Sequence, residues 1–553
     1  MKSLIYLLAL LFVNLVYINT FAQNKFNDTG KLASLCKVWG MLKYFHPQVG
    51  NGKRDWDKEL MDKIPDVLNA ENRTALDKIY TSWIAALGPM DELKISPEPE
   101  TVTESNKFLE WEKDSVYFSN EMDSLMNFVF THRLKGENYY VSAHQYTHQA
   151  EFENENDFKG QLNPSKEMRL LALFRYWNMI EYYFPSKYLI GEDWQQVLNE
   201  MIPDFYFNNQ LPYKTALREL VASIHDSHGM LMPPDSNKTG YYCGDFTMKV
   251  IGDKAVVTGV IKDSIPNSSG MNYGDVITAV NDTLLADYIA AKKKYISASN
   301  DAVVLRTIPV SDIVCGSSET ISLTIDRGGS VMKKTIYRDT CITAKGMKLR
   351  DTSKPVFRIL DDGTGYINMG RLTGDMVKDA YSLVAGKSAV ILDVRNYPKG
   401  TMYEICRLFG KAFVPFVKFT EPDFSCPGTF KWANVYRCGP LLHKKIKNRK
   451  IIVLINEQTQ SHAEFTCMAF KTLPDVTFIG SQTAGADGNV SLISLPGGYK
   501  TYMSGLGVYY PDCTVTQRIG IVPDIEVHPT VKGIQEHRDE VMERAINYIK
   551  TGK

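Results

Sequence analysis

The sequence lacks the motifs of several large protein classes. It contains no CxxC pair, which disfavours a zinc ribbon or a thioredoxin-like motif, and its ten histidines form no HExxH pattern. It has neither a dinucleotide-binding fingerprint nor a P-loop. Lysine and arginine balance aspartate and glutamate at 63 each, so the formal net charge is zero, which argues against nucleic acid or an anionic membrane as the main partner. These absences predict no metal site and no cofactor.

Long apolar runs are also missing, except at the start of the chain. Lys2 gives a positive beginning, Leu4–Val16 is mostly apolar, and Thr20–Ala22 offers small residues at a cleavage site. This pattern predicts a secretory signal over residues 1–22, a secreted or periplasmic protein, and no stable membrane insertion after cleavage. Asn14 and Asn19 break up the apolar stretch, which makes a membrane anchor the less favoured alternative.

The nine cysteines leave at least one without an internal disulfide partner. Cys426 and Cys438 lie in a stretch that contains Pro and Gly, and we expect that they could pair in an oxidising compartment. Cys467 is interpreted as a buried core thiol.

An internal repeat is visible with an offset of 138 residues. Trp39 matches Trp177 (177 − 39 = 138), and Trp56 matches Trp194 (194 − 56 = 138). Apolar residues recur at three and four positions inside each copy, which predicts two helical units with buried aromatic residues. The stretch between the copies is polar and charge-rich, and we interpret it as a connector.

The texture becomes β-rich from about Tyr241. Thr247–Val250, Ala255–Val260 and Ile321–Ile325 contain clustered or alternating β-branched residues. The run Gly274-Asp275-Val276-Ile277, followed by a turn, resembles the PDZ domain, which implies that a strand edge could accept an extended peptide. A β-rich spacer that binds nothing is the alternative.

Strands and helices alternate from about Val356, which predicts an α/β fold with a largely parallel sheet. The expected strands are 365–369, 388–394 and 451–456, and the expected helices are 375–385, 402–413 and 463–473. Ser461 stands where the third strand turns into the third helix. Such a serine can be a helix N-cap, or a nucleophile whose developing oxyanion is stabilised by the free N–H groups of the helix start.

Three segments of this region resemble the tail-specific (C-terminal processing) serine protease family. They are the strand followed by Asn456-Glu457-Gln458-Thr459-Gln460-Ser461-His462-Ala463-Glu464, the segment Leu392-Asp393-Val394-Arg395-Asn396-Tyr397-Pro398-Lys399-Gly400, and the closing segment Gly520-Ile521-Val522-Pro523-Asp524-Ile525. The resemblance covers roughly residues 215–530. It implies a protease core of the ClpP/crotonase type in which Ser461 is the nucleophile.

The resemblance also implies how Ser461 is activated. One branch of the family has a Lys base where this chain has Ala486, so that base is not available. The tricorn-core branch places a Ser-His pair ahead of the PDZ domain, and here that pair is Ser227-His228, with His228 as general base and Ser227 orienting it. A histidine that caps the end of a helix is the alternative for His228.

Two positions depart from the family pattern. The backbone N–H groups of His462 and of Lys399-Gly400 would form the oxyanion hole, but the family has two glycines where this chain has Lys399-Gly400. The tricorn-core branch has a Glu where Gln517 stands, so the fourth member of the constellation carries no charge. The sequence alone therefore predicts that Gln517→Glu raises kcat.

The sequence thus predicts a multidomain serine peptidase that hydrolyses peptides or protein tails, with peptide or unfolded protein substrates. A non-catalytic peptide-binding protein on the same fold and an esterase or acyl-transfer enzyme remain alternatives. The expected organisation is a signal peptide (1–22), a first helical unit (23–95), a polar connector (96–165), a second helical unit with the Ser-His pair (166–235), a PDZ-like domain (236–342) and an α/β protease core (343–553).

Overall fold

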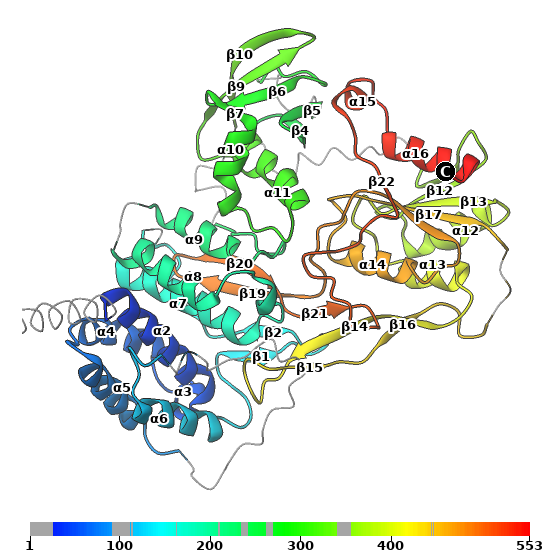
Figure 1. Cartoon of the computed structure of the whole chain (residues 1–553). Helices are drawn as coiled ribbons and strands as arrows, with labels where there is room; N and C mark the ends of the chain where they lie inside the picture. Colours follow the sequence, from blue (N-terminus) through cyan, green and yellow to red (C-terminus); the bar gives the residue numbers. More distant parts are fainter. Residues whose placement is uncertain are drawn as a thin grey trace, which may run out of the picture. The chain divides into compact units, whose positions relative to one another are not determined.

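The computed structural model describes residues 26–90, 111, 114–161, 163–207, 211–233, 242–260, 269–339, 355–443, 445 and 447–553. The predicted signal segment lies outside them. The chain divides into two compact units (Figure 1), of which the first comprises Met1–Leu220, Glu421–Lys431 and Ser491–Lys500. The second comprises Val221–Thr420, Trp432–Val490 and Thr501–Lys553. In the part of the chain that is described, no helix is both long enough and apolar enough to cross a bilayer.

The first unit is helical and contains the sequence repeat. Helices α2 (Asp28–Phe45) and α7 (Lys166–Tyr183) each have 18 residues and start 138 positions apart (166 − 28). The other elements of this region are α3 (Pro47–Gly50), α4 (Trp56–Leu68), α5 (Arg73–Leu87), α6 (Asn120–Thr131), β1 (Val141–Ala143), β2 (Ala150–Phe152), η2 (Lys187–Leu189), α8 (Trp194–Ile202), η3 (Pro203–Phe207) and α9 (Tyr213–Ala222).

The two copies use the same pair of tryptophans to join their helices. In the first copy, Trp39 Nε1 donates to the Trp56 carbonyl at 3.0 Å, and Trp56 Nε1 donates back to the Trp39 carbonyl at 3.1 Å. Trp177 and Trp194 exchange the same two bonds at 2.9 and 3.2 Å. These indoles are buried, so each N–H needs a partner, and the reciprocal bonds satisfy both.

The second unit begins with a β-rich part. Its sheet has the order β10-β9-β6-β5-β4, with β7 paired to β6, and neighbouring strands are antiparallel. The elements are β3 (Tyr242–Cys243), β4 (Phe246–Ile251), β5 (Lys254–Val260), β6 (Val276–Val280), β7 (Thr283–Leu284), α10 (Leu285–Lys292), η4 (Lys293–Tyr295), α11 (Asp301–Ile308), η5 (Pro309–Val314), β8 (Cys315–Gly316), β9 (Thr320–Arg327) and β10 (Ser330–Tyr337).

A disulfide joins Cys243 and Cys315, which corrects the expected cysteine pairing. Strands β3 and β8 pair with these two cysteines directly opposite each other, so register brings the thiols together. Cys426 and Cys438 are buried and form no disulfide, so the expectation that they pair is wrong. Cys467 is a free, buried thiol in the core of the second unit.

The α/β core has a six-stranded sheet with the order β11-β12-β13-β17-β18-β22. Strands β12 to β22 are parallel along this order, and β11 is antiparallel at one edge. The elements are β11 (Phe357–Ile359), β12 (Gly365–Asn368), η6 (Gly374–Met376), α12 (Val377–Val384), β13 (Ala389–Asp393), α13 (Met402–Phe409), β17 (Lys450–Ile455), α14 (His462–Phe470), β18 (Val476–Gly480), β22 (Ile525–Glu526), α15 (Val531–Gln535) and α16 (Glu540–Thr551).

Alternate residues of the core strands face two hydrophobic layers. Val453 and Ile455 of β17 pack in the cluster that includes residues of α12, α13 and α14. Ile452 and Leu454 of the same strand pack in the cluster that includes Val541 of α16. Because both faces of the sheet are covered, its strands are continuously apolar, and their carboxyl ends are left to carry polar loops.

Other strands form two smaller sheets. Strand β14 (Val414–Pro422) pairs with β16 (Tyr436–Cys438) and with β21 (Gly507–Tyr509), and the hairpin of β19 (Val490–Leu495) and β20 (Tyr499–Ser504) ends at Ser504. The remaining strand is β15 (Phe430–Trp432).

Candidate active site

Ser461 lies in the turn between β17 and α14 with φ +57° and ψ −126°. A non-glycine residue rarely adopts this backbone conformation, and its persistence means that surrounding contacts hold it. The Ser461 N–H donates to the Ala486 carbonyl at 2.9 Å and lies 3.2 Å from Glu464 Oε2. The turn therefore presents a partly exposed serine hydroxyl at the start of a helix, as a nucleophile requires.

Glu464 ties this turn to the loop that follows β18. Its carboxylate accepts the N–H groups of Gly485 at 2.8 Å and Ala486 at 3.1 Å. Burial raises the pKa of Glu464, and these hydrogen bonds oppose the shift by stabilising the anion. Ala486, at the position of the family's alternative Lys base, is fully buried and offers only a methyl group.

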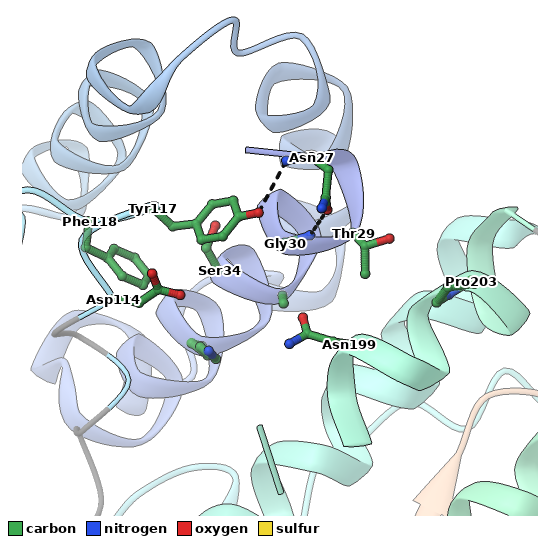
Figure 2. Close-up of a pocket in the computed structure, with 11 residues that line it drawn as sticks. Asn27, Thr29, Gly30, Ser34, Asp114, Tyr117, Phe118, Asn199 and Pro203 are labelled. Atoms are coloured by element: carbon green, nitrogen blue, oxygen red, sulfur yellow. Dashed lines mark hydrogen bonds between the residues drawn. The ribbon is translucent and has the colours of Figure 1, made fainter. Parts of the chain in front are cut away.

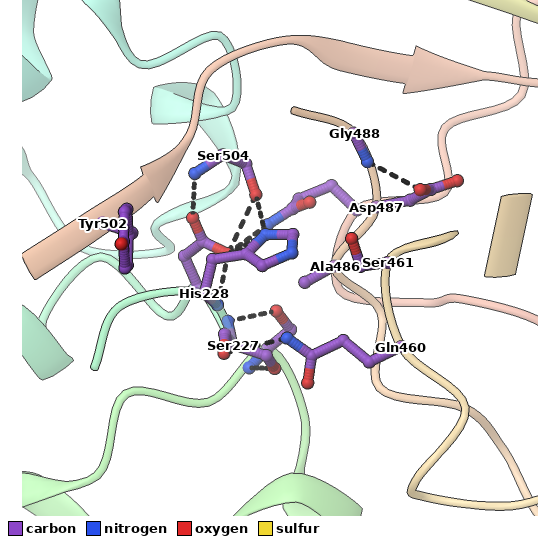
Figure 3. A network of polar contacts seen from close by, with 12 residues as sticks. Ser227, His228, Gln460, Ser461, Ala486, Asp487, Gly488, Tyr502 and Ser504 are labelled. Atoms are coloured by element: carbon purple, nitrogen blue, oxygen red, sulfur yellow. Dashed lines mark hydrogen bonds and ion pairs between the residues drawn. The ribbon is translucent and has the colours of Figure 1, made fainter. Parts of the chain in front are cut away.

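The residues that precede His228 and Ser461 hold these two segments together. Gln460, directly before Ser461, donates its side-chain amide to the Ser227 carbonyl at 3.1 Å. The His228 Nδ1 atom lies 2.9 Å from Ser504 Oγ, and Ser504 Oγ lies 3.0 Å from Asp226 Oδ1 (Figure 3). An aspartate, a serine and a histidine thus form a chain of hydrogen bonds.

This chain fixes the tautomer of His228. A carboxylate only accepts hydrogen bonds, so the Ser504 hydroxyl donates to Asp226 and must accept from Nδ1–H of His228. The free electron pair of the imidazole is then on Nε2, which is buried and has no hydrogen-bond partner. Burial lowers the pKa of His228, and the Asp226 carboxylate opposes this shift. The ring is held neutral with Nε2 ready to accept a proton.

Asp226 is fully buried and is the charged centre of the network. It accepts the Ser504 N–H at 2.5 Å and the His228 N–H at 3.1 Å in addition to the Ser504 hydroxyl. The Gln517 side-chain amide lies 3.4 Å from Asp226 Oδ1. The sequence-based site did not include Asp226 or Ser504. An Asp two residues before His228 offered a weak signal, and nothing in the sequence marked Ser504.

Two other predicted site residues have contacts that differ from the expectation. The Ser227 hydroxyl donates to the Ala484 carbonyl at 3.1 Å and accepts the Ser299 N–H at 2.8 Å, and it makes no hydrogen bond to the His228 ring. The ring is held by Ser504 instead, because the Ser227 side chain is directed to the loop that contains Ala484. Gln517 meets the network at Asp226 and not at Ser227.

The predicted oxyanion donors differ in whether their N–H groups already have an acceptor. The His462 N–H is the first of α14 and has no acceptor within the helix. The Lys399 N–H is taken by the Met369 carbonyl at 3.3 Å, so this donor is not free. Gly400, with φ +78°, has an N–H with no acceptor among the described residues. Its loop approaches the nucleophile segment, since the Tyr397 and His462 ring centroids lie 6.0 Å apart.

The other histidines near Ser461 have contacts that differ from those of His228. The His462 ring packs against the rings of Tyr397 and Phe465, with centroid distances of 6.0 Å in each case, and its Nε2 is buried. His225 makes no ring hydrogen bond to a described site residue. Across the described ranges, no group of three or more His, Cys, Asp or Glu side chains is placed to hold a metal ion.

Residues 363–527 match the family model described as peptidase family S41. Among solved structures, mature CPAF has a TM-score of 0.53 at 14% identity, covering 70% of this chain and 98% of that chain. Mature CPAF complexed with lactacystin has a TM-score of 0.51 at 13% identity, covering 70% and 99%.

The photosystem II D1 C-terminal processing protease has a TM-score of 0.37 at 15% identity, covering 67% of this chain and 96% of that chain. No curated protein sequence matches the chain. The likeness to mature CPAF supports the fold, and the family match covers both the turn that contains Ser461 and the closing segment. Residues 363–527 are thus similar to peptidase family S41, and this similarity supports a serine peptidase hydrolase.

Proposed function

We propose that this chain is a secreted or periplasmic endopeptidase that cleaves peptides or the C-terminal tails of proteins through an acyl-enzyme on Ser461. The observation that carries the proposal is the coincidence of a strained serine at a helix start with a histidine whose Nδ1 is held and whose buried Nε2 is unpartnered. A structural N-cap serine needs neither the strain nor the histidine.

In the proposed reaction, Ser461 Oγ attacks the peptide carbonyl carbon as His228 Nε2 takes the hydroxyl proton. The backbone N–H groups of His462 and Gly400 stabilise the oxyanion. The C–N bond then breaks, and His228 gives its proton to the leaving amine. A water molecule attacks the acyl-enzyme by the same steps and releases the carboxylic acid product. Asp226 stabilises the transient imidazolium through Ser504.

The β-rich part would supply the substrate-binding surface of a PDZ-like domain. Within the described residues β4 has a single sheet neighbour, β5, so its other edge could accept an extended peptide. Arg306 of α11 donates to the Glu457 carbonyl and to Gln460 Oε1 in the nucleophile turn. Lys249 of β4 forms an ion pair with Glu457 at 2.9 Å. A peptide on this edge would therefore bind beside elements that contact the turn.

The test is labelling with a fluorophosphonate together with hydrolysis of a peptide library. We expect covalent labelling at Ser461, peptide cleavage, and loss of both in Ser461→Ala with an unchanged melting temperature. Labelling without cleavage of any peptide, but with turnover of simple esters, would favour an esterase. Absence of labelling in a folded protein would favour a non-catalytic peptide-binding protein.

A further inference from the structure

A cavity that the peptidase site does not use lies beside α2 of the first helical copy. Its volume is about 450 Å³, within the range of small-ligand sites. Figure 2 shows it between the start of α2, the segment around Tyr117 and the helix α8. The lining residues are Asn27, Thr29, Gly30, Ala33, Ser34, Lys37, Asp114, Tyr117, Phe118, Asn199 and Pro203.

Lys37 is the buried cation of this cavity. Its exposed fraction is 6%, and among the described residues no hydrogen bond or ion pair reaches its ammonium group. Burial lowers the pKa of Lys37, and the charge of Asp114 opposes the shift. Buried ammonium groups are normally paired, because leaving a charge desolvated without a partner is costly. An anionic ligand in the cavity would provide the missing partner.

In the second helical copy, the equivalent buried cation is paired with carboxylates. Lys37 of α2 corresponds to Arg175 of α7 (175 − 37 = 138). The Arg175 guanidinium is fully buried, donates to Asp57 Oδ2 at 2.7 Å and pairs with Glu155 Oε2 at 2.9 Å. The cation of the second copy thus has carboxylate partners from the chain itself. The equivalent cation of the first copy faces an open cavity.

Other residues that line the cavity complement the rest of a ligand. Thr29 and Gly30 belong to the first turn of α2, whose positive end favours an anion. Asp114 and Asn199 are exposed and lie at the rim. The cavity therefore has a cation inside and a carboxylate at its mouth. A ligand with a carboxylate and, a few atoms away, an ammonium group matches both charges.

We propose that this cavity binds a small α-amino carboxylate, either a free amino acid or the terminal residue of a short peptide. Lys37 pairs with the carboxylate, and Asp114 faces the ammonium group. This site lies within the first unit, and its occupation does not depend on the peptidase mechanism.

Calorimetric titration of the full chain carrying Ser461→Ala, which prevents turnover, tests the proposal. The probes are L-alanine, dialanine, L-alaninamide, acetate and inorganic phosphate. We expect L-alanine or dialanine to bind, with a Kd of about 1 mM or tighter, and L-alaninamide, which lacks the carboxylate, not to bind. No binding of either carboxylate at about ten times that concentration overturns the proposal. Binding of phosphate in place of the carboxylates overturns the ligand assignment.

Variants connect the binding to the cavity. Lys37→Met should weaken carboxylate binding about tenfold or more, because a charged hydrogen bond is lost. Lys58→Met removes an exposed cation from α4 in the same copy and should leave binding unchanged. Asp114→Asn, at the exposed rim, should weaken L-alanine more than acetate. Because Asp114→Asn does not disturb the core, it gives an answer even if Lys37→Met fails to fold. Equal affinities in both variants overturn the proposal.

Discussion

Removal of the Ser504 hydroxyl tests which serine orients the base. Ser504→Ala deletes the oxygen that lies 2.9 Å from His228 Nδ1 and 3.0 Å from Asp226 Oδ1. Asp226 then remains 3.7 Å from Nδ1, which is too far for a hydrogen bond. The imidazole loses the one ring hydrogen bond that it makes with the described residues, and the tautomer with Nε2 free is no longer selected.

The size of the effect follows from the charge that develops on the ring. A hydrogen bond to a charged group contributes about 1.5–3 kcal/mol, which corresponds to about a 10- to 150-fold loss in kcat/KM when the imidazolium forms in the transition state. Ser227→Ala removes only bonds to the backbone at Ala484 and Ser299. We expect it to lower the free energy of unfolding by about 1 kcal/mol per bond and to leave kcat nearly unchanged.

The assay is steady-state cleavage of one fluorogenic peptide by the natural protein and both variants, with Ser461→Ala as background and melting temperatures measured in parallel. The two serines serve as controls for each other. A large loss of kcat in Ser227→Ala, together with full activity in Ser504→Ala, would refute the reasoning and restore the role that the sequence resemblance gave to Ser227.

Other predictions concern charge and covalent structure. Burial lowers the pKa of His228, so kcat/KM should fall on the acid side with a midpoint below 6.5. Asp226→Asn should move this midpoint lower still, because the Asp226 carboxylate opposes the shift. A midpoint above 6.5 in the natural protein contradicts this prediction. Gln517→Glu should destabilise the fold at neutral pH, since two buried carboxylates that are both ionised repel each other, and the penalty should become smaller at low pH, where one of them binds a proton. Melting curves at about pH 4 and 7 measure this, and melting temperatures equal to those of the natural protein at both pH values would refute it. Replacing Cys243 and Cys315 by Ser opens a cross-link between residues 72 positions apart, and should lower the free energy of unfolding by about 4 kcal/mol in urea titrations; an unchanged value would show that the cross-link is absent.

The sequence predicted those features that local patterns determine. The continuous apolar run before Ser461 predicted β17. The offset of 138 residues that relates Trp39 to Trp177 and Trp56 to Trp194 predicted two matching helical copies. These features depend on residues close in the chain. The pairing of Cys243 with Cys315 was missed because it depends on the register of two short strands, which no local pattern specifies.

The support of His228 was missed for the same physical reason. Ser504 reaches the ring from the end of a hairpin 276 residues away in the sequence. A serine at the end of a strand is common, and only the folded backbone shows that this one lies between a carboxylate and an imidazole. Lys399 is a related case, because the carbonyl that accepts its N–H belongs to Met369, which lies in a different part of the fold.

The position of Asp226 changes the meaning of Gln517. From the sequence, a Gln in place of the family's Glu suggested a site without a negative charge for the imidazolium. In the structure the carboxylate comes from Asp226, two residues before the base, and the Gln517 amide lies against its Oδ1. A neutral amide donor can lie beside that buried carboxylate, whereas a second carboxylate would compete with it for the same donors. The carboxylate of this hydrogen-bond chain therefore comes from Asp226, and the neutral amide of Gln517 is compatible with it.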